Sequence, residues 1–226
     1  MNSYMFRQGC RPVGDFRILQ IIEFLNLMKK AFRIDAWYDD RNRPVDTSHD
    51  YLYPMFQKRI DKVFPGIGVN KDFFSIPPRN RDDNTVRFEI HTGTHPEEIF
   101  IDSYDISIGA ARLVPNCSYL RRSIQIFQPF EAYVAESRNE DFLDAYNREQ
   151  AIPKFDKPAV IRGFHYLDEG IARSIGGIDY CLKAPAWKVE RFCQGVLIQL
   201  VRGLFDSDNP EHLRIQKKTM QYFGLL

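Results

Sequence analysis

The sequence predicts an α+β protein with a mixed, largely antiparallel sheet and flanking helices. Three observations lead to this prediction. Short segments of alternating apolar and polar residues, typical of strands, recur along the chain. Other segments carry the apolar spacing of amphipathic helices, and strands and helices do not alternate strictly as βαβ units would require. With 226 residues, of which 44% are hydrophobic, the chain is long enough to bury a substantial core.

The N-terminal part of the chain contains two predicted helices. Residues 15–32 form the first, because Asp15 can cap its start and lysines occupy its last turn, where they suit the negative end of the helix dipole. Its predicted apolar face consists of Leu19, Ile22, Leu25 and Met28. Residues 49–64 form the second predicted helix, and residues 65–85, rich in proline, glycine and charge, form a loop or linker.

A hairpin is predicted next. In residues 85–93, "TVRFEIHTG", apolar residues alternate with polar ones, as expected of a strand with one buried face. Residues 97–110 supply its partner strand, and "TGTHP" connects the two strands.

The second half of the chain mixes both element types. Its predicted elements are a helix at 117–127, a strand at 130–137, a short polar helix at 139–150 and strands at 159–167 and 195–205. The near-continuous apolar run of the last strand suits a central position in a sheet. A C-terminal helix follows: Asn209 caps it, Pro210 takes the first helical position, Glu211 favours its positive end and Gly224 closes it.

The domain organisation is predicted to be simple. Residues 1–226 are expected to form one α+β domain, with a subdomain break near residues 65–85 as the alternative.

Charge and composition restrict the function classes. A formal net charge of +1 provides no global field for nucleic acid or an anionic membrane, so direct binding to either is not expected. No apolar run approaches the ~20 residues that span a bilayer, and the N-terminus lacks the apolar core of a signal peptide. The expected compartment is therefore the cytoplasm. Four scattered cysteines, without a C-x-x-C pair, give no metal–thiolate pattern.

His91 and His95 are the strongest candidates for catalysis. They stand four residues apart, and Asp102 or Asp105 from the return strand could complete a metal site for a hydrolase. An H-x-x-x-H pair is informative when both residues share one face of a helix. Here the alternation predicts a strand, so we interpret the pair as the rim of a hairpin and expect neither a bound metal nor a cofactor. The metal-dependent hydrolase stays the alternative function.

Other catalytic patterns are weak. The acids that begin at Asp206 resemble a calcium loop, but Glu211 and Lys217 stand where glycine and glutamate are needed. No phosphate-binding loop or nucleophile elbow occurs. Cys193 is expected to be a small buried hydrophobic residue, and its pairing with His165 is a weak alternative. No catalytic residue is therefore predicted, and the chain is expected not to be an enzyme.

Paired acids and aromatics are the candidates for binding a partner. Several acidic pairs could converge into a local negative patch that attracts a basic partner. Tryptophan and tyrosine are common interface anchors, although such side chains also cover hydrophobic cores. The candidate partner-binding residues are Trp37, Tyr38, Asp39, Asp40, Asp82, Asp83, Glu97, Glu98, Glu140 and Asp141.

The C-terminal segment resembles a known family. Residues 194–218, "QGVLIQLVRGLFDSDNPEHLRIQKK", combine a glycine-led apolar strand with an F-D-x-D-N-P-E-H-L turn and helix. This combination resembles a family of bacterial immunity proteins associated with type VI secretion. Segments 24–40, 124–137 and 159–170 resemble that family in the same order, with Phe164 where a tryptophan is expected and Gln128 as a second departure.

The resemblance implies a function without turnover. Immunity proteins of this family protect the cell from a cognate polymorphic toxin, typically one with a restriction-endonuclease-like nuclease fold. It therefore implies a cytoplasmic protein that binds a cognate toxin, a nuclease effector, and neutralises it by stoichiometric occlusion of its active cleft, or else by blocking an assembly that the toxin needs. Acidic clusters facing the DNA-binding surface of the nuclease would provide electrostatic complementarity.

Overall fold

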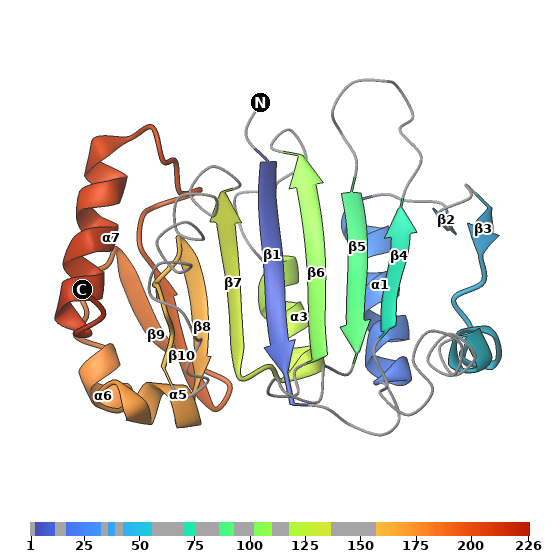
Figure 1. Cartoon of the computed structure of the whole chain (residues 1–226), viewed down its shortest axis with the longest axis horizontal. Helices are drawn as coiled ribbons and strands as arrows, with labels where there is room; N and C mark the ends of the chain where they lie inside the picture. The colour runs from blue at the N-terminus through green and yellow to red at the C-terminus, as the bar shows by residue number, and fades with distance from the viewer. Residues whose placement is uncertain are drawn as a thin grey trace. The chain divides into compact units, whose positions relative to one another are not determined.

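The computed structural model describes residues 3–11, 17–32, 36–38, 43–55, 70–75, 86–92, 102–109, 118–136 and 157–226. The fold is α+β, as the sequence predicts. The chain divides into two compact units, one made of Met1 and Arg7–Pro129 and the other of Asn2–Phe6 and Phe130–Leu226. We call them unit 1 and unit 2. In Figure 1 unit 1 runs from blue to green, and unit 2 runs from yellow to red apart from its blue N-terminal residues.

Unit 1 contains an antiparallel sheet. Its strands are β2 (Trp37–Tyr38), β3 (Pro44–Val45), β4 (Asn70–Ser75), β5 (Val86–Thr92) and β6 (Asp102–Gly109), together with Arg7–Cys10 of β1 (Ser3–Cys10). The strand order is β3-β2-β4-β5-β6-β1. Phe88 of β5 pairs with Phe74 of β4 and with Ile106 of β6, both in antiparallel register. The predicted pair of strands is thus confirmed, whereas its "TGTHP" connection lies outside the described residues.

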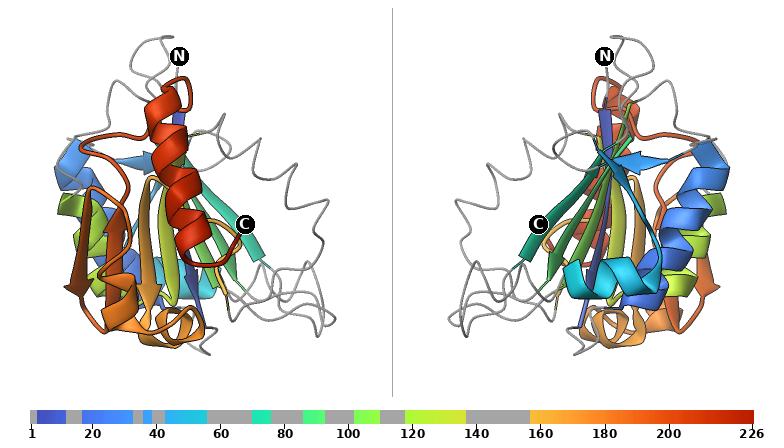
Figure 2. Two further views of the ribbon diagram at one scale, coloured as in Figure 1. Left: turned by 90° about the vertical axis from the view of Figure 1, so that its left-hand side faces the viewer. Right: turned by 90° about the vertical axis from the view of Figure 1, so that its right-hand side faces the viewer.

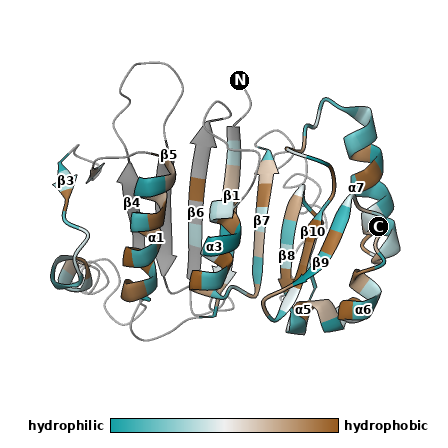
Figure 3. Cartoon of the chain, turned by 180° about the vertical axis from the view of Figure 1, so that it is seen from behind, coloured by the Kyte–Doolittle hydropathy of each residue, from teal (hydrophilic) through white to brown (hydrophobic). Residues whose placement is uncertain are grey.

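Helices α1 (Ile18–Phe32) and α3 (Ser118–Phe127) cover one face of this sheet, as Figures 2 and 3 show. The ring of Phe24 meets that of Phe127 edge-on, with centroids 5.3 Å apart, and Phe127 stacks on Tyr104 of β6 at 4.3 Å. The helices predicted at 15–32 and 117–127 are confirmed. Of the helix predicted at 49–64, residues 49–55 are described and are helical.

The buried face of α1 differs from the predicted one. It consists of Ile18, Ile21, Phe24, Leu25 and Met28. Leu19 was expected inside, but its side chain is 70% exposed. The predicted set advances by three residues at each step, so it drifts around a helix of 3.6 residues per turn. The observed set combines steps of three and four and stays on one face.

Unit 2 contains β7 (Glu131–Glu136), β8 (Phe164–Asp168), β9 (Lys188–Phe192) and β10 (Gly195–Gln199), in the order β1-β7-β8-β10-β9. The pairs β7–β8, β8–β10 and β10–β9 are antiparallel. The predicted central position of the apolar run is confirmed, since β10 lies between β8 and β9. The strand predicted at 159–167 begins only at Phe164.

Three helices accompany this sheet: α5 (Glu169–Ser174), α6 (Ile178–Cys181) and α7 (Pro210–Tyr222). They enclose a core with one apolar face of β8 and β10, built from Leu167, Val196 and Ile198 together with residues such as Ile171, Phe205 and Met220. Tyr4 of β1 donates its hydroxyl hydrogen to the carbonyl of Phe205 at 3.1 Å. Residues 3–6 of the N-terminal strand are therefore part of this unit, which the sequence did not predict.

The division between the units falls after Pro129. Residues 65–85, where the sequence suggests an alternative break, contain β4, which pairs with β2 and β5. The helix predicted at 139–150 lies outside the described residues. Among the helices of the described part of the chain, none is long and apolar enough to cross a membrane.

Gly195 allows the close approach of β8 and β10. A Cβ atom at this position would lie 2.1 Å from the carbonyl oxygen of Leu167 and 2.9 Å from the Cα of Asp168. Both are backbone atoms of the paired strand, so they cannot move aside as the end of a side chain can. The glycine that leads the apolar run is therefore a packing requirement.

We predict that Gly195→Ala lowers the free energy of unfolding by about 3 kcal/mol or more, at the upper end of the usual cost of overpacking. Urea denaturation followed by circular dichroism measures it. Gly170→Ala on α5 is the matched control. There the new Cβ first meets a side-chain oxygen of Asp168 at 3.2 Å, and alanine favours the helix, so the change stays within about 1 kcal/mol. Equal effects of both substitutions would contradict the proposed role of Gly195.

Candidate functional site

Most of the predicted partner-binding acids cannot be placed. Asp39, Asp40, Asp82, Asp83, Glu97, Glu98, Glu140 and Asp141 lie outside the described residues. The negative patch that they would form stays a prediction. Only Trp37 and Tyr38 of the predicted set are described, and both belong to β2 of unit 1.

Trp37 is a core residue. Its side chain is fully buried, and its indole N–H donates to the carbonyl of Leu25 on α1 at 3.3 Å. A buried ring with its polar hydrogen already bonded has no surface to offer a partner, so the assignment of Trp37 as an interface anchor is corrected. Tyr38 is half-buried, while Tyr51 and Tyr53 are exposed.

Of the two histidines predicted at the rim of the hairpin, only His91 lies within the described residues. His91 lies on β5, paired with Lys71 of β4 and Ser103 of β6, which confirms that it belongs to a strand. His95 lies outside the described residues. Within the described ranges, no group of three or more histidine, cysteine, aspartate or glutamate residues could hold a metal ion. The hydrolase alternative gains no observation in its favour.

A buried polar cluster in unit 2 was missed by sequence reasoning. His165 on β8 is fully buried; its Nδ1 accepts from the backbone N–H of Arg162 at 3.1 Å. Nε2 therefore carries the ring hydrogen and donates to Glu131 on β7 at 2.8 Å. The Arg162 guanidinium lies 3.8 Å from the centroid of the Tyr133 ring, a cation–π contact.

This cluster stabilises the structure rather than offering reactive groups. Both ring nitrogens of His165 are engaged and no part of the ring reaches solvent, so the imidazole has no free lone pair for a ligand. The cluster joins β7, β8 and the segment before β8 by charge-assisted and cation–π contacts. One sign of this cluster was present in the sequence, namely the position of His165 between apolar residues of a predicted strand.

None of the described cysteines, Cys10, Cys181 and Cys193, forms a nucleophilic site with His165, whose ring nitrogens bond to other groups. Cys193, expected to be buried, is exposed in the turn between β9 and β10, where its backbone φ is 49°. That prediction was wrong because the apolar strand begins at Gly195, after the turn. Burial raises the pKa of the Cys181 thiol to about 11, and partial desolvation of the Cys193 thiol also raises its pKa. Raised pKa values reduce the thiolate fraction on which nucleophilic reactivity depends.

The C-terminal motif folds into a hydrogen-bonded turn and helix. The backbone N–H of Asp206 donates to His212 Nδ1 at 3.0 Å, and the backbone N–H of Ser207 donates to the buried Glu136 at 2.6 Å. Asn209 Oδ1 accepts from the N–H of Glu211 at 3.0 Å, so the predicted cap is confirmed. The turn is thus held by bonds within the motif and by one bond to Glu136, which is distant in the sequence.

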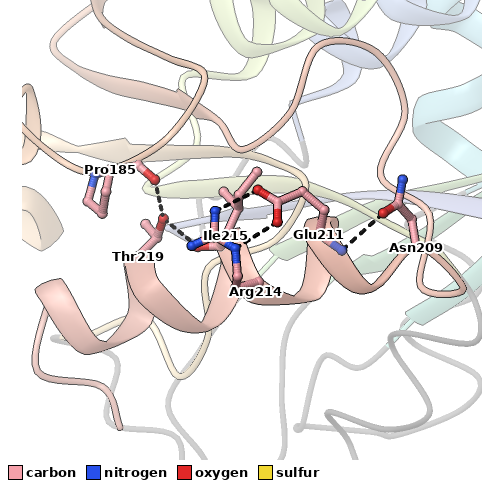
Figure 4. A network of polar contacts seen from close by, with 6 residues as sticks. All are labelled: Pro185, Asn209, Glu211, Arg214, Ile215 and Thr219. Carbon is pink, nitrogen blue, oxygen red and sulfur yellow. Dashed lines mark hydrogen bonds and ion pairs between the residues drawn. The ribbon is translucent and has the colours of Figure 1, made fainter.

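Helix α7 is fixed at several points (Figure 4). The Glu211 carboxylate receives two hydrogen bonds from Arg214, at 2.7 and 2.6 Å, which lower its pKa. The Thr219 hydroxyl lies 3.1 Å from the carbonyl of Pro185 and 2.9 Å from that of Ile215. The Gln216 amide donates to Ile161 at 2.9 Å. Gln216 and Thr219 therefore hold α7 against the chain at Ile161 and at Pro185.

Two features of the described surface remain as candidates for binding. On unit 1, a shallow depression of about 250 Å³ between α1 and α3 contains exposed Leu19 and the ion pair Glu23–Arg122, 2.7 Å long. On unit 2, exposed large side chains lie on or near α6 and α7, namely Tyr180, Trp187, Leu213 and Leu226. Trp187 and Tyr180 are of the residue types that dominate binding energy at protein interfaces.

The fold resembles that of a protein of the type VI secretion system. The sequence matches no family model and no curated protein. Among solved structures, the Pseudomonas aeruginosa T6SS protein PA0821 has a similar fold, with a TM-score of 0.65 over 100% of this chain and 73% of that chain. The two sequences are 9% identical. The likeness therefore establishes a shared α+β fold.

We predict that Asn209→Ala lowers the free energy of unfolding by about 1 kcal/mol, the usual cost of losing an N-cap. Asn209→Asp is the control and retains most of the stability, because aspartate caps equally well. Urea denaturation of both variants measures the difference. If Asn209→Ala leaves stability unchanged, the motif is not held by the hydrogen bonds described above.

Proposed function

We propose that this chain is an immunity protein that binds and neutralises a cognate toxin of a type VI secretion system. The observation that carries the proposal is the likeness of fold to a T6SS protein over the full length of the chain. The resemblance of residues 194–218 to immunity proteins was noted independently from the sequence. The fold and the C-terminal motif thus both support an association with type VI secretion.

The site geometry is compatible with inhibition by binding. The groups in the described residues that look most like catalysts, His165 and Glu131, are held in a closed hydrogen-bonded cluster. The exposed aromatic side chains of unit 2 instead offer rigid, apolar contact area. In this proposal the chain has no turnover, needs no cofactor, and acts as a preformed domain that occludes the toxin's active cleft.

The nature of the toxin follows from the family resemblance. We propose a nuclease effector, inhibited in the cytoplasm, where its nucleic-acid substrate is found. Occlusion of such a cleft would bury on the order of 1,600 Å² in total, the usual size of a specific interface. The acidic pairs outside the described residues are the groups proposed to face the basic cleft.

We predict that co-expression of this chain rescues bacteria from the toxin domain encoded beside its gene, and that the two proteins co-purify as a complex. The measurement is growth with and without the chain, followed by affinity purification through a tag on the toxin. A toxin domain from an unrelated gene pair is the specificity control.

Growth arrest that persists in the presence of folded, soluble chain, with no co-purification, would contradict the proposal. Rescue without a complex would also contradict it, because it would point to turnover of the toxin or of its product.

A further inference from the structure

The C-terminal end of α7 is joined to α6 by a pair of stacked tyrosines. The rings of Tyr180 and Tyr222 lie 4.5 Å apart at an interplanar angle of 16°. Each hydroxyl donates to the other residue's carbonyl, Tyr180 Oη at 2.5 Å and Tyr222 Oη at 3.0 Å. Tyr180 is nevertheless 38% exposed. The pair therefore presents aromatic surface whose geometry is already fixed, which lowers the entropic cost of binding.

Two lysines flank the stacked tyrosines. The backbone N–H of Lys183 donates to the carbonyl of Tyr180 at 3.0 Å, which places Lys183 in the turn directly after α6. Lys218 lies one helical turn before Tyr222, so the two residues share a face of α7. Both lysines are exposed. We call Tyr180, Lys183, Lys218 and Tyr222 the tyrosine–lysine surface.

The lysines of this surface differ in their pairing from Arg191, Arg214 and Lys188. Arg191 pairs with Asp179 at 2.6 Å, Arg214 with Glu211 at 2.6 Å, and Lys188 with Glu190 at 3.1 Å. For Lys183 and Lys218, no ion pair occurs within the part of the chain that the structure describes. Their charges are therefore available to an acidic group of another molecule.

Charge and geometry favour an acidic protein surface over nucleic acid as the ligand. DNA-binding proteins typically contact about six to ten phosphates, whereas this surface has two lysines on a chain of formal net charge +1. Carboxylates of a partner can pair with the two lysines while its apolar atoms cover the tyrosine rings. A rigid aromatic centre with a charged rim has the composition of a protein-binding hot spot.

We propose that the tyrosine–lysine surface binds an acidic surface of the cognate toxin, an inference that rests on the proposed function and assigns it a contact region in unit 2. This region differs from the acidic loops predicted from the sequence, and its charge has the opposite sign. The toxin then meets a basic, aromatic surface at the α6–α7 end of unit 2.

The test is the affinity of the full chain for the toxin domain encoded beside its gene. The variant is the double charge reversal Lys183→Glu with Lys218→Glu. Lys217→Glu is the matched control, because it makes the same change at the adjacent position of α7 but projects about 100° away around the helix. Binding is measured by calorimetry at about 50 mM and about 300 mM NaCl, and thermal unfolding confirms that each variant is folded.

We expect the double variant to raise Kd at least about tenfold at low salt and by a smaller factor at high salt, because screening weakens the lost attraction. Lys217→Glu should change Kd by less than about twofold, as expected of a residue outside the interface. A double variant that binds as tightly as the wild type, or a Lys217→Glu effect of the same size, overturns this inference and leaves the proposed function standing. A wild-type chain that does not bind the toxin overturns both.

Discussion

Unit 2 depends on the burial of β10. This strand lies between β8 and β9. Its first four residues, Gly195, Val196, Leu197 and Ile198, are all buried. Burying the side chains of Val196 and Ile198 contributes about 1.5–3 kcal/mol each. The close contact of Gly195 with Leu167 sets the spacing of the strands, and α5, α6 and α7 cover the resulting apolar face. The positions of the exposed side chains on α6 and α7 follow from this core.

The polar groups of unit 2 support the same arrangement. The His165 cluster joins β7 to β8, and the motif after Phe205 fixes the start of α7 through Asn209, His212 and the buried Glu136. The side chains of His165 and Glu136 are thus used internally. Tyr180 and Trp187 remain exposed on this unit, and they are of the residue types that anchor protein interfaces.

Local signals in the sequence predicted the elements whose determinants are local. The cap and first turn of α7 are set by Asn209, Pro210 and Glu211, and the alternation over residues 86–92 identified β5. In β1 the alternation is obscured because Gln8, a polar residue, is buried alongside Tyr4 and Phe6. Helices α5 and α6 span six and four residues, too few for a helical period to be recognised.

The candidate site was less predictable because it depends on contacts between distant residues. Residue type alone does not say whether an aromatic side chain is buried or exposed, and Trp37 and Trp187 show the two outcomes. The stacking of Tyr180 on Tyr222 joins residues 42 positions apart, so it follows only from the packing of α7 against the loop at Pro185. The acidic pairs singled out in the sequence lie outside the described residues and remain predicted contacts.

The central claim, inhibition by stoichiometric binding, is tested most directly by titrating the toxin's enzymatic activity with the purified chain at concentrations well above Kd. The account predicts that activity falls linearly to zero at a fixed molar ratio and then stays constant with time. Loss of activity that continues at a large molar excess of toxin would show turnover by the chain and contradict the account. Full toxin activity at every ratio would contradict it as well.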